Sequence, residues 1–159
     1  MRLYHGSNVV VTAPRLMISE RTLDFGNGFY LTTDYDQAAK RAVTKTKRQQ
    51  SGNPVISVFD VTDEAWATLS KLTFACASVE WLRFVSANRR RMEVDCSADV
   101  VIGPVANDNT MPVLNLYFMG AYTEDEAIRR LLPQKLKDQL AFRTDKAIAA
   151  LVFKEVMWP

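Results

Sequence analysis

Short apolar stretches recur along the chain, and several of them are rich in β-branched residues, which predicts strands. The predicted strands cover residues 1–5, 29–32, 55–61, 99–105, 139–143 and 153–158. The stretch at 55–61 is apolar at most positions and is typical of a buried strand. Residues 9–18 are apolar as well, but Pro14 favours a strand or irregular structure over a helix there.

Helical spacing appears in other parts of the chain. Small apolar residues recur at this spacing from Ala38 to Val43, and Thr33-Asp34 ahead of them is typical of a helix N-cap. Further predicted helices cover residues 63–70, 78–88, 123–132 and a segment that begins at Asp145. Because strands and helices do not alternate regularly, the pattern predicts a mixed α+β fold rather than a doubly wound parallel sheet.

The length of 159 residues fits one domain, 1–159, with a core of its own. The composition is ordinary for a globular protein, and the net charge of +2 gives no general reason to expect binding to nucleic acid or to a membrane. Two small basic groups, Arg89-Arg90-Arg91 and the group of Lys45, Lys47 and Arg48, are interpreted as solvated helix ends.

Metal and disulfide chemistry are not indicated. The two cysteines make no disulfide framework, and Cys76, in an apolar run, is predicted to be buried. A single histidine, His5, does not predict a zinc site of the usual type. No apolar stretch approaches the roughly 20 residues of a membrane helix, and no signal peptide precedes Leu3, so we expect a cytoplasmic protein.

Two segments carry candidate chemistry. His5 ends the first predicted strand and is followed by Gly6 and Ser7, where a glycine would let backbone groups approach a flat ligand. The second segment, Gly26-Asn27-Gly28-Phe29-Tyr30, is a glycine loop that runs into an aromatic strand. Alone, each segment is more typical of a structural role: a structural or exposed histidine, and a tight turn with core aromatics. The spacing is also not that of a GxGxxG dinucleotide fingerprint.

Together, these segments resemble the ADP-ribosyltransferase superfamily, in the His-Tyr clade that includes diphtheria-type toxins and poly(ADP-ribose) polymerases. Over nearly its full length the chain is similar to the bacterial DUF3990 family of small ADP-ribosyltransferase-like proteins. The resemblance rests on residues 3–7, 24–32, 80–82, 103–108 and 138–147. It implies a split β-sandwich with flanking helices and an NAD cleft between two small sheets.

The resemblance also implies roles for individual residues. His5 would hydrogen-bond a ribose hydroxyl of NAD, and Gly6, beside Ser7, would present backbone groups to the nicotinamide carboxamide. Tyr30 would pack against the nicotinamide ring, with Gly28 in the loop ahead of it. These residues would hold NAD while its glycosidic bond stretches, so that orientation and electrostatics carry the catalysis.

One departure from the pattern concerns the late strand, where transferases of this superfamily usually carry a glutamate. Gln139 aligns with it; an amide bonds a hydroxyl but carries no charge to stabilise a cation, so we expect Gln139→Glu to raise NAD cleavage. Asp108 is the candidate substitute acid, although a turn-forming role is equally consistent with its position. Arg89 or Arg90 is a candidate contact for the NAD pyrophosphate, and a surface salt bridge is the alternative role.

The leading functional hypothesis is a mono-ADP-ribosyltransferase that moves ADP-ribose from NAD to a macromolecular acceptor. Small bacterial proteins of this kind resemble toxins of toxin–antitoxin systems, which would imply a protein antitoxin as partner. A non-catalytic module that binds NAD or ADP-ribose is the alternative that Gln139 favours, and an NAD glycohydrolase is a third.

Overall fold

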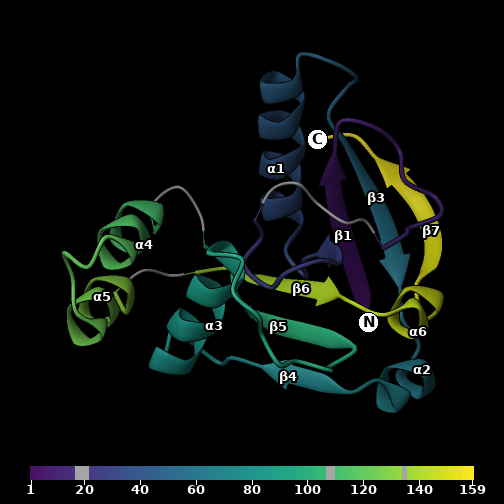
Figure 1. The fold of residues 1–159 in the computed structure, drawn as a ribbon. Helices are drawn as coiled ribbons and strands as arrows, with labels where there is room; N and C mark the ends of the chain where they lie inside the picture. The colour runs from purple at the N-terminus through teal and green to yellow at the C-terminus, as the bar shows by residue number, and fades with distance from the viewer. Residues whose placement is uncertain (17–21, 107–109, 134–135) are drawn as a thin grey trace.

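The chain has a mixed α+β fold with two β-sheets and, among the described residues, six helices (Figure 1). The structure is a computed structural model, and it describes residues 1–16, 22–106, 110–133 and 136–159. The predicted α+β class is therefore confirmed.

The first sheet has three antiparallel strands in the order β1-β3-β7. They are β1 (Arg2–Ser7), β3 (Val55–Asp60) and β7 (Val152–Met157). The central strand β3 is buried at every position except Asp60, which explains why its sequence is apolar throughout.

The second sheet has four strands in the order β2-β6-β5-β4. They are β2 (Phe29–Leu31), β6 (Asp138–Phe142), β5 (Val100–Pro104) and β4 (Lys71–Thr73). The pair β4–β5 is parallel and the other two pairs are antiparallel. A single bridge between Tyr4 and Thr32 joins the edge of this sheet to β1.

The helices are α1 (Tyr35–Gln49), α2 (Asp63–Thr68), α3 (Val79–Arg89), α4 (Met111–Phe118), α5 (Glu124–Leu131) and α6 (Asp145–Ala149). Five of them begin at a serine, threonine or aspartate whose side chain accepts a backbone N–H of the first turn, as Asp34 does for α1. Helix α1 stands against the three-stranded sheet, while α4 and α5 form a hairpin that projects from the body (Figure 1).

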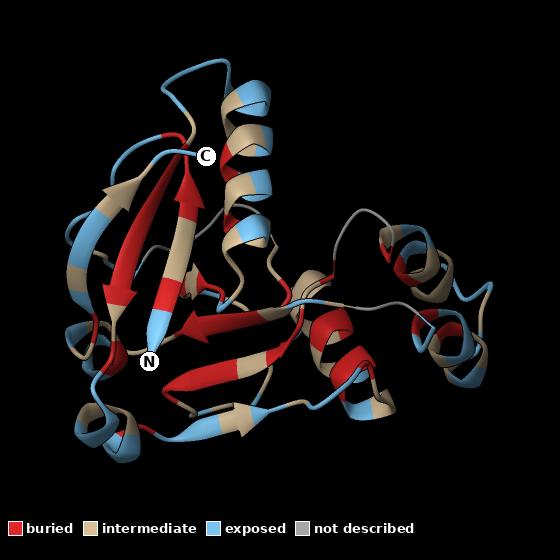
Figure 2. Cartoon of the chain, turned by 180° about the vertical axis from the view of Figure 1, so that it is seen from behind, coloured by how far each residue is buried: buried red, intermediate tan, exposed pale blue. Residues whose placement is uncertain are grey.

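Two apolar clusters lie on the two faces of the four-stranded sheet (Figure 2). The first joins the sheets to each other, because Leu3 and Phe59 of one pack with Phe29 and Phe142 of the other. The second lies between the four-stranded sheet and the helices α3, α4 and α5, with Trp81 at its centre. The two sheets therefore share one core, and this core fixes the position of one sheet relative to the other.

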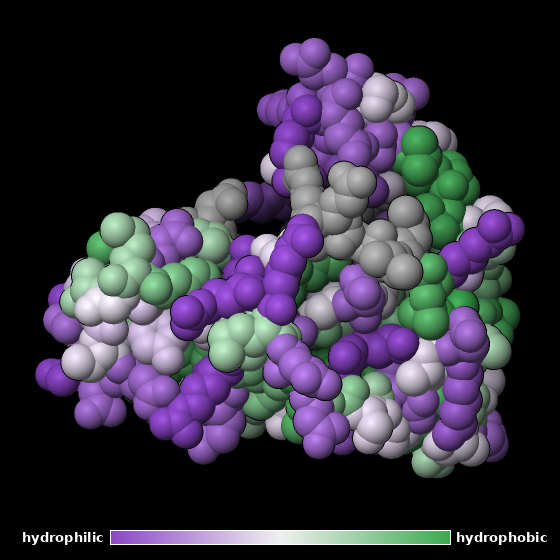
Figure 3. Space-filling view, viewed as in Figure 1, coloured by the Kyte–Doolittle hydropathy of each residue, from purple (hydrophilic) through white to green (hydrophobic). Residues whose placement is uncertain are grey.

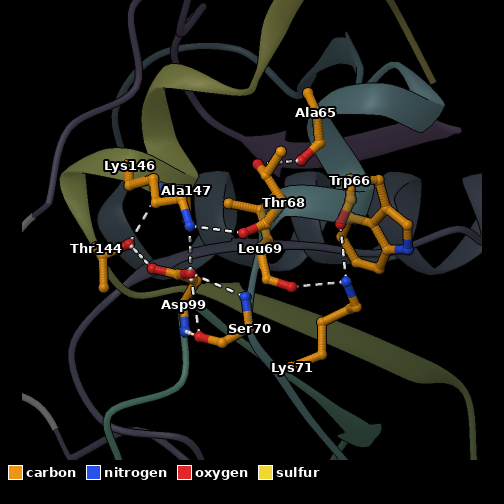
Figure 4. A network of polar contacts seen from close by, with 10 residues as sticks. All are labelled: Ala65, Trp66, Thr68, Leu69, Ser70, Lys71, Asp99, Thr144, Lys146 and Ala147. Carbon is orange, nitrogen blue, oxygen red and sulfur yellow. Dashed lines mark hydrogen bonds and ion pairs between the residues drawn. The ribbon is translucent and has the colours of Figure 1, made fainter.

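Asp99 organises a polar network at the end of the four-stranded sheet that lies near α2 and α6 (Figure 4). Its carboxylate accepts hydrogen bonds from Thr144 Oγ1 (2.6 Å) and from Ser70 N and Oγ (2.9 and 3.0 Å), and Lys146 Nζ lies 3.4 Å away. These bonds, led by that of Thr144, lower the pKa of Asp99 to about 2. The carboxylate thus ties β4, β5 and α6 together.

We expect Asp99→Asn to lower the free energy of unfolding by about 1–3 kcal/mol at neutral pH, because the donors of Thr144, Ser70 and Lys146 would lose the carboxylate charge that accepts from them. The folded-state pKa lies below the unfolded value, so the contribution is present above about pH 4 and is lost as the pH falls through about 2. Urea denaturation of parent and variant between pH 7 and 2 measures this. A stability difference that stays constant down to pH 2 would contradict the assignment.

Candidate functional site

A cleft of about 470 Å³ opens between α1 and the edge where the two sheets part. This volume lies within the range of small-molecule sites. Its walls come from β1, β2 and α1, from the two residues after β5 and from the start of β6 with the residue before it. The polar and aromatic side chains of its lining include those of Tyr4, Tyr30, Asp34, Asp36, Gln37, Lys40, Arg41, Lys45, Arg48, Lys137 and Gln139.

Gly6 forms part of the cleft wall and offers its backbone there. Tyr4 exchanges both of its backbone hydrogen bonds with Thr32 (2.9 and 3.0 Å). Residues two apart in a strand turn their N–H and C=O groups to the same edge, so Gly6 faces the same edge as Tyr4. The bridge at Tyr4 is isolated, and no described strand residue pairs with Gly6 on that edge. A donor and an acceptor are therefore available to a ligand.

Gly6 also has a structural reason to be glycine. A Cβ atom at this position would lie 1.9 Å from the carbonyl oxygen of Ala38 in α1. The helix therefore rests directly on the β1 backbone, and any side chain would push it away.

Tyr30 lines the cleft, and its hydroxyl holds the side chain in place through two hydrogen bonds. Its hydroxyl donates to Gly26 O (2.7 Å) and accepts from Phe25 N (3.0 Å), so the ring is pinned to the preceding loop. Burial raises the pKa of Tyr30, and the phenol stays neutral. Gly26 has φ +76°, a conformation that favours glycine, and this explains one of the two glycines of the motif.

His5 lies beside the cleft rather than in its wall. Its ring stacks on Phe29 with centroids 4.4 Å apart, and Nδ1 lies 2.8 Å from Tyr30 O. Because a carbonyl only accepts, Nδ1 carries the proton and Nε2 has a lone pair. Burial lowers the pKa of His5 to about 4, with Arg41 and Lys45 contributing, so the ring is neutral at physiological pH. The structure thus brings His5 and Tyr30 together, but their side chains point to different sides.

Helix α1 supplies four cations to the cleft: Lys40, Arg41, Lys45 and Arg48. Within the described part of the chain, none of the four forms an ion pair with a carboxylate. Desolvation and the neighbouring positive charges lower the pKa of both Lys45 and Arg41, although the Arg41 side chain keeps access to solvent. The surface around the C-terminal end of α1 is mostly hydrophilic (Figure 3). This uncompensated positive charge is suited to an anionic ligand.

Gln139 reaches the cleft from β6 and is 6% exposed. Its Nε2 donates to Asp24 Oδ2 (2.8 Å). The same carboxylate accepts Ala106 N on Oδ2 (3.0 Å) and Arg89 Nε and Nη2 on Oδ1 (2.6 and 2.5 Å). Asp24, which the sequence did not single out, is therefore the carboxylate behind this wall of the cleft.

The other predicted site residues lie elsewhere. Arg89 is bound to Asp24 and does not line the cleft, so its guanidinium has a partner other than a ligand phosphate. Ser7 is fully buried and accepts from Lys45 Nζ (3.0 Å), and Gly28 packs against β6, where a Cβ would lie 2.9 Å from Phe142 O. Asp108 lies outside the described residues.

The sequence held one signal for the cations. Arg41, Lys45 and Arg48 are spaced by four and three residues, which places them on one helix face, and Ala38 and Ala42 are the buried residues of that helix. The interpretation of Lys45, Lys47 and Arg48 as a solvated helix end is therefore incomplete, because two of the three line the cleft.

Other predictions concern metals, membranes and thiols. Cys76 is exposed, so its predicted burial is wrong: the apolar run around it ends before the N-cap of α3. Within the described ranges, no group of three histidine, cysteine or acidic side chains is arranged to hold a metal ion. Over the same residues, every helix is too short or too polar to cross a membrane.

We expect the His5 ring to stay neutral down to about pH 5, with the proton on Nδ1. Since the chain contains a single histidine, nitrogen-15 NMR of the ring reports this state without ambiguity. The folded pKa lies below the unfolded value near 6.5, so the parent should lose about 3 kcal/mol of stability as the pH falls from 6.5 to 4. His5→Gln should lack this loss, and a ring that titrates near pH 6.5 would refute the geometry.

The comparison with known families gives one match. The family model of DUF3990, described as a protein of unknown function, matches residues 1–153, and the chain belongs to this family. No curated protein and no solved structure shows a significant match to the chain.

Proposed function

We propose that this member of the DUF3990 family binds NAD in the α1 cleft and transfers ADP-ribose to a macromolecular acceptor, as a mono-ADP-ribosyltransferase with a split β-sandwich fold in one domain. The observation that carries the proposal is the meeting of Gly6, Tyr30 and Gln139 with the α1 cations around one cleft. Each supplies a different contact for a dinucleotide: backbone groups, an aromatic face, a hydroxyl partner and positive charge.

The nicotinamide end of NAD fits the wall formed by β1 and β2. The Gly6 N–H can donate to the oxygen of a carboxamide, and the Gly6 C=O can accept from its NH₂ group. The pinned ring of Tyr30 offers a flat surface for the nicotinamide ring. His5 lies beside the cleft and holds the β2 backbone through Tyr30 O, so in the proposed site it positions the strand that carries Tyr30.

The pyrophosphate fits the α1 face better than it fits Arg89, the contact expected from the sequence. Arg41, Lys45 and Arg48 are unpaired with carboxylates among the described residues, whereas Arg89 is committed to Asp24. Guanidinium groups bind phosphate oxygens with two parallel hydrogen bonds, and removal of like-charge repulsion adds to the gain on binding.

A non-catalytic module that binds NAD or ADP-ribose is the second candidate. It is favoured by the neutral side chain of Gln139 at the late-strand position, because an amide neither stabilises a cation as a carboxylate does nor takes a proton. An NAD glycohydrolase is the third candidate, with water as acceptor. For the transferase, a toxin role with a protein antitoxin as partner remains our hypothesis.

The function is tested by incubating the purified protein with NAD and a cell lysate. Released nicotinamide together with labelled macromolecules supports the transferase, and nicotinamide with free ADP-ribose supports the hydrolase. Binding of NAD by calorimetry without turnover supports the module. If the protein neither binds NAD nor cleaves it, the proposal is wrong.

We expect Arg41→Ala and Lys45→Ala each to weaken NAD binding by about 10-fold, because each removes a charge-assisted phosphate contact. The parent affinity should also fall with rising salt, and more steeply than that of the variants. Lys47→Ala is the matched control, since Lys47 lies on the same helix but does not line the cleft. An equal loss in all three variants would indicate a general charge effect and not a phosphate site.

A further inference from the structure

Asp24 and Gln139 form a buried pair whose geometry defines the chemistry of one cleft wall. A carboxylate only accepts hydrogen bonds, so the Gln139 group that faces it 2.8 Å away is the NH₂ group. The amide oxygen Oε1 therefore points elsewhere. No hydrogen bond joins Gln139 Oε1 to another described residue. Gln139 lines the cleft, so this oxygen is the acceptor that its side chain can offer there.

Asp24 has no capacity left for a ligand. It is 5% exposed, and its two oxygens already accept four hydrogen bonds, from Arg89 twice, from Ala106 and from Gln139. Asp24 does not line the cleft. Any influence that it has on a bound molecule passes through Gln139.

We propose that Asp24 is a positioning residue that fixes the Gln139 amide with its oxygen toward the cleft, where that oxygen accepts a hydrogen bond from a sugar hydroxyl of the ligand. The hydroxyl is that of a ribose if the proposed NAD site is correct, so this part rests on the proposed function. The cleft wall thus offers a neutral acceptor backed by a buried carboxylate, and the charge sits one residue behind the position where a catalytic glutamate would be.

The pair makes Gln139→Glu a sharp test. A glutamate at this position would place a second carboxylate in contact with Asp24, and two buried carboxylates in contact cannot both ionise. The pKa of the new carboxyl would be raised, so the variant should approach the parent in stability near pH 5 and fall well below it at pH 8. Gln49→Glu is the matched control, because it makes the same charge change at an exposed position of α1.

The double variant Asp24→Asn/Gln139→Glu reverses the roles, with an amide behind and a carboxylate in the cleft. At pH 8 its loss in the free energy of unfolding should be smaller than the sum of the losses in the two single variants, because an N–H again faces a carboxylate. Thermal unfolding of the four proteins at pH 5 and pH 8 measures this. Additive effects, or a Gln139→Glu variant as stable as the control at both pH values, would overturn the orientation of the amide.

The ligand role is measured by calorimetry with NAD and with ADP-ribose. Gln139→Met, which keeps the volume but removes the acceptor, should weaken binding by about 2- to 10-fold. The double variant should bind within about threefold of the parent, because its introduced carboxylate again presents an oxygen to the cleft. Unchanged binding by the Met variant would overturn the acceptor role alone. If neither compound binds the parent, the proposed function and the acceptor role both fall, while the unfolding data still decide how Asp24 holds the amide.

Discussion

The contact on which the site depends is the approach of α1 to β1 at Gly6. The Ala38 carbonyl lies so close to the strand that no side chain fits between them, and the helix axis is thereby fixed against the three-stranded sheet. Close to the same position, the backbone pairing of β1 with β2 stops after the single Tyr4–Thr32 bridge. The next backbone hydrogen bond of that ladder would use the Tyr30 carbonyl, but this carbonyl accepts from the His5 ring instead. The cleft therefore arises from a close helix contact and an interrupted ladder, and both are set by the residues of the first motif.

The charges around the cleft are arranged in two opposite ways. The Asp24 carboxylate is buried and saturated with hydrogen bonds, so it stabilises the fold and has nothing to gain from a ligand. The α1 cations are crowded at helical spacing without carboxylate partners in the described chain, and this arrangement costs stability through like-charge repulsion. Asp34 is neutralised by Lys137, which leaves the positive charge dominant. Natural sequences tolerate such local conflict mainly at functional sites, and this favours an anion as the ligand.

Sequence patterns predict the long, strongly apolar elements well and the short ones poorly. The strands β3 and β5 and the helix α5 match their predicted positions within two residues, and α1 begins directly after the predicted cap residue Asp34. Burial and capping act over neighbouring residues, and sequence patterns therefore predict these elements. The three-residue strand β4 is polar at two positions and is not predicted. Helix α4 is apolar on several faces and therefore shows little periodicity, and it carries Pro112 as its second residue. The Asp24–Gln139 contact spans 115 residues, and no local pattern encodes it.

That contact changes how the missing glutamate is understood. In the comparison with the ADP-ribosyltransferase pattern, Gln139 stands where a charged glutamate is usual, and Gln139→Glu would restore that charge. In the structure a carboxylate already stands behind the amide, so the substitution adds a second acid rather than a first one. The saturated Asp24 cannot also serve as a general base, and the described acids that line the cleft are Asp34, which is paired with Lys137, and the exposed Asp36 in the first turn of α1. Under the proposed function, nicotinamide would leave as a neutral molecule and would need no proton, so its release would depend on orientation and on electrostatic stabilisation by the groups around the cleft. Deprotonation of the acceptor would then be the step for which the described residues of this cleft are least suited, and the proposed transferase would favour acceptors that react without a strong base.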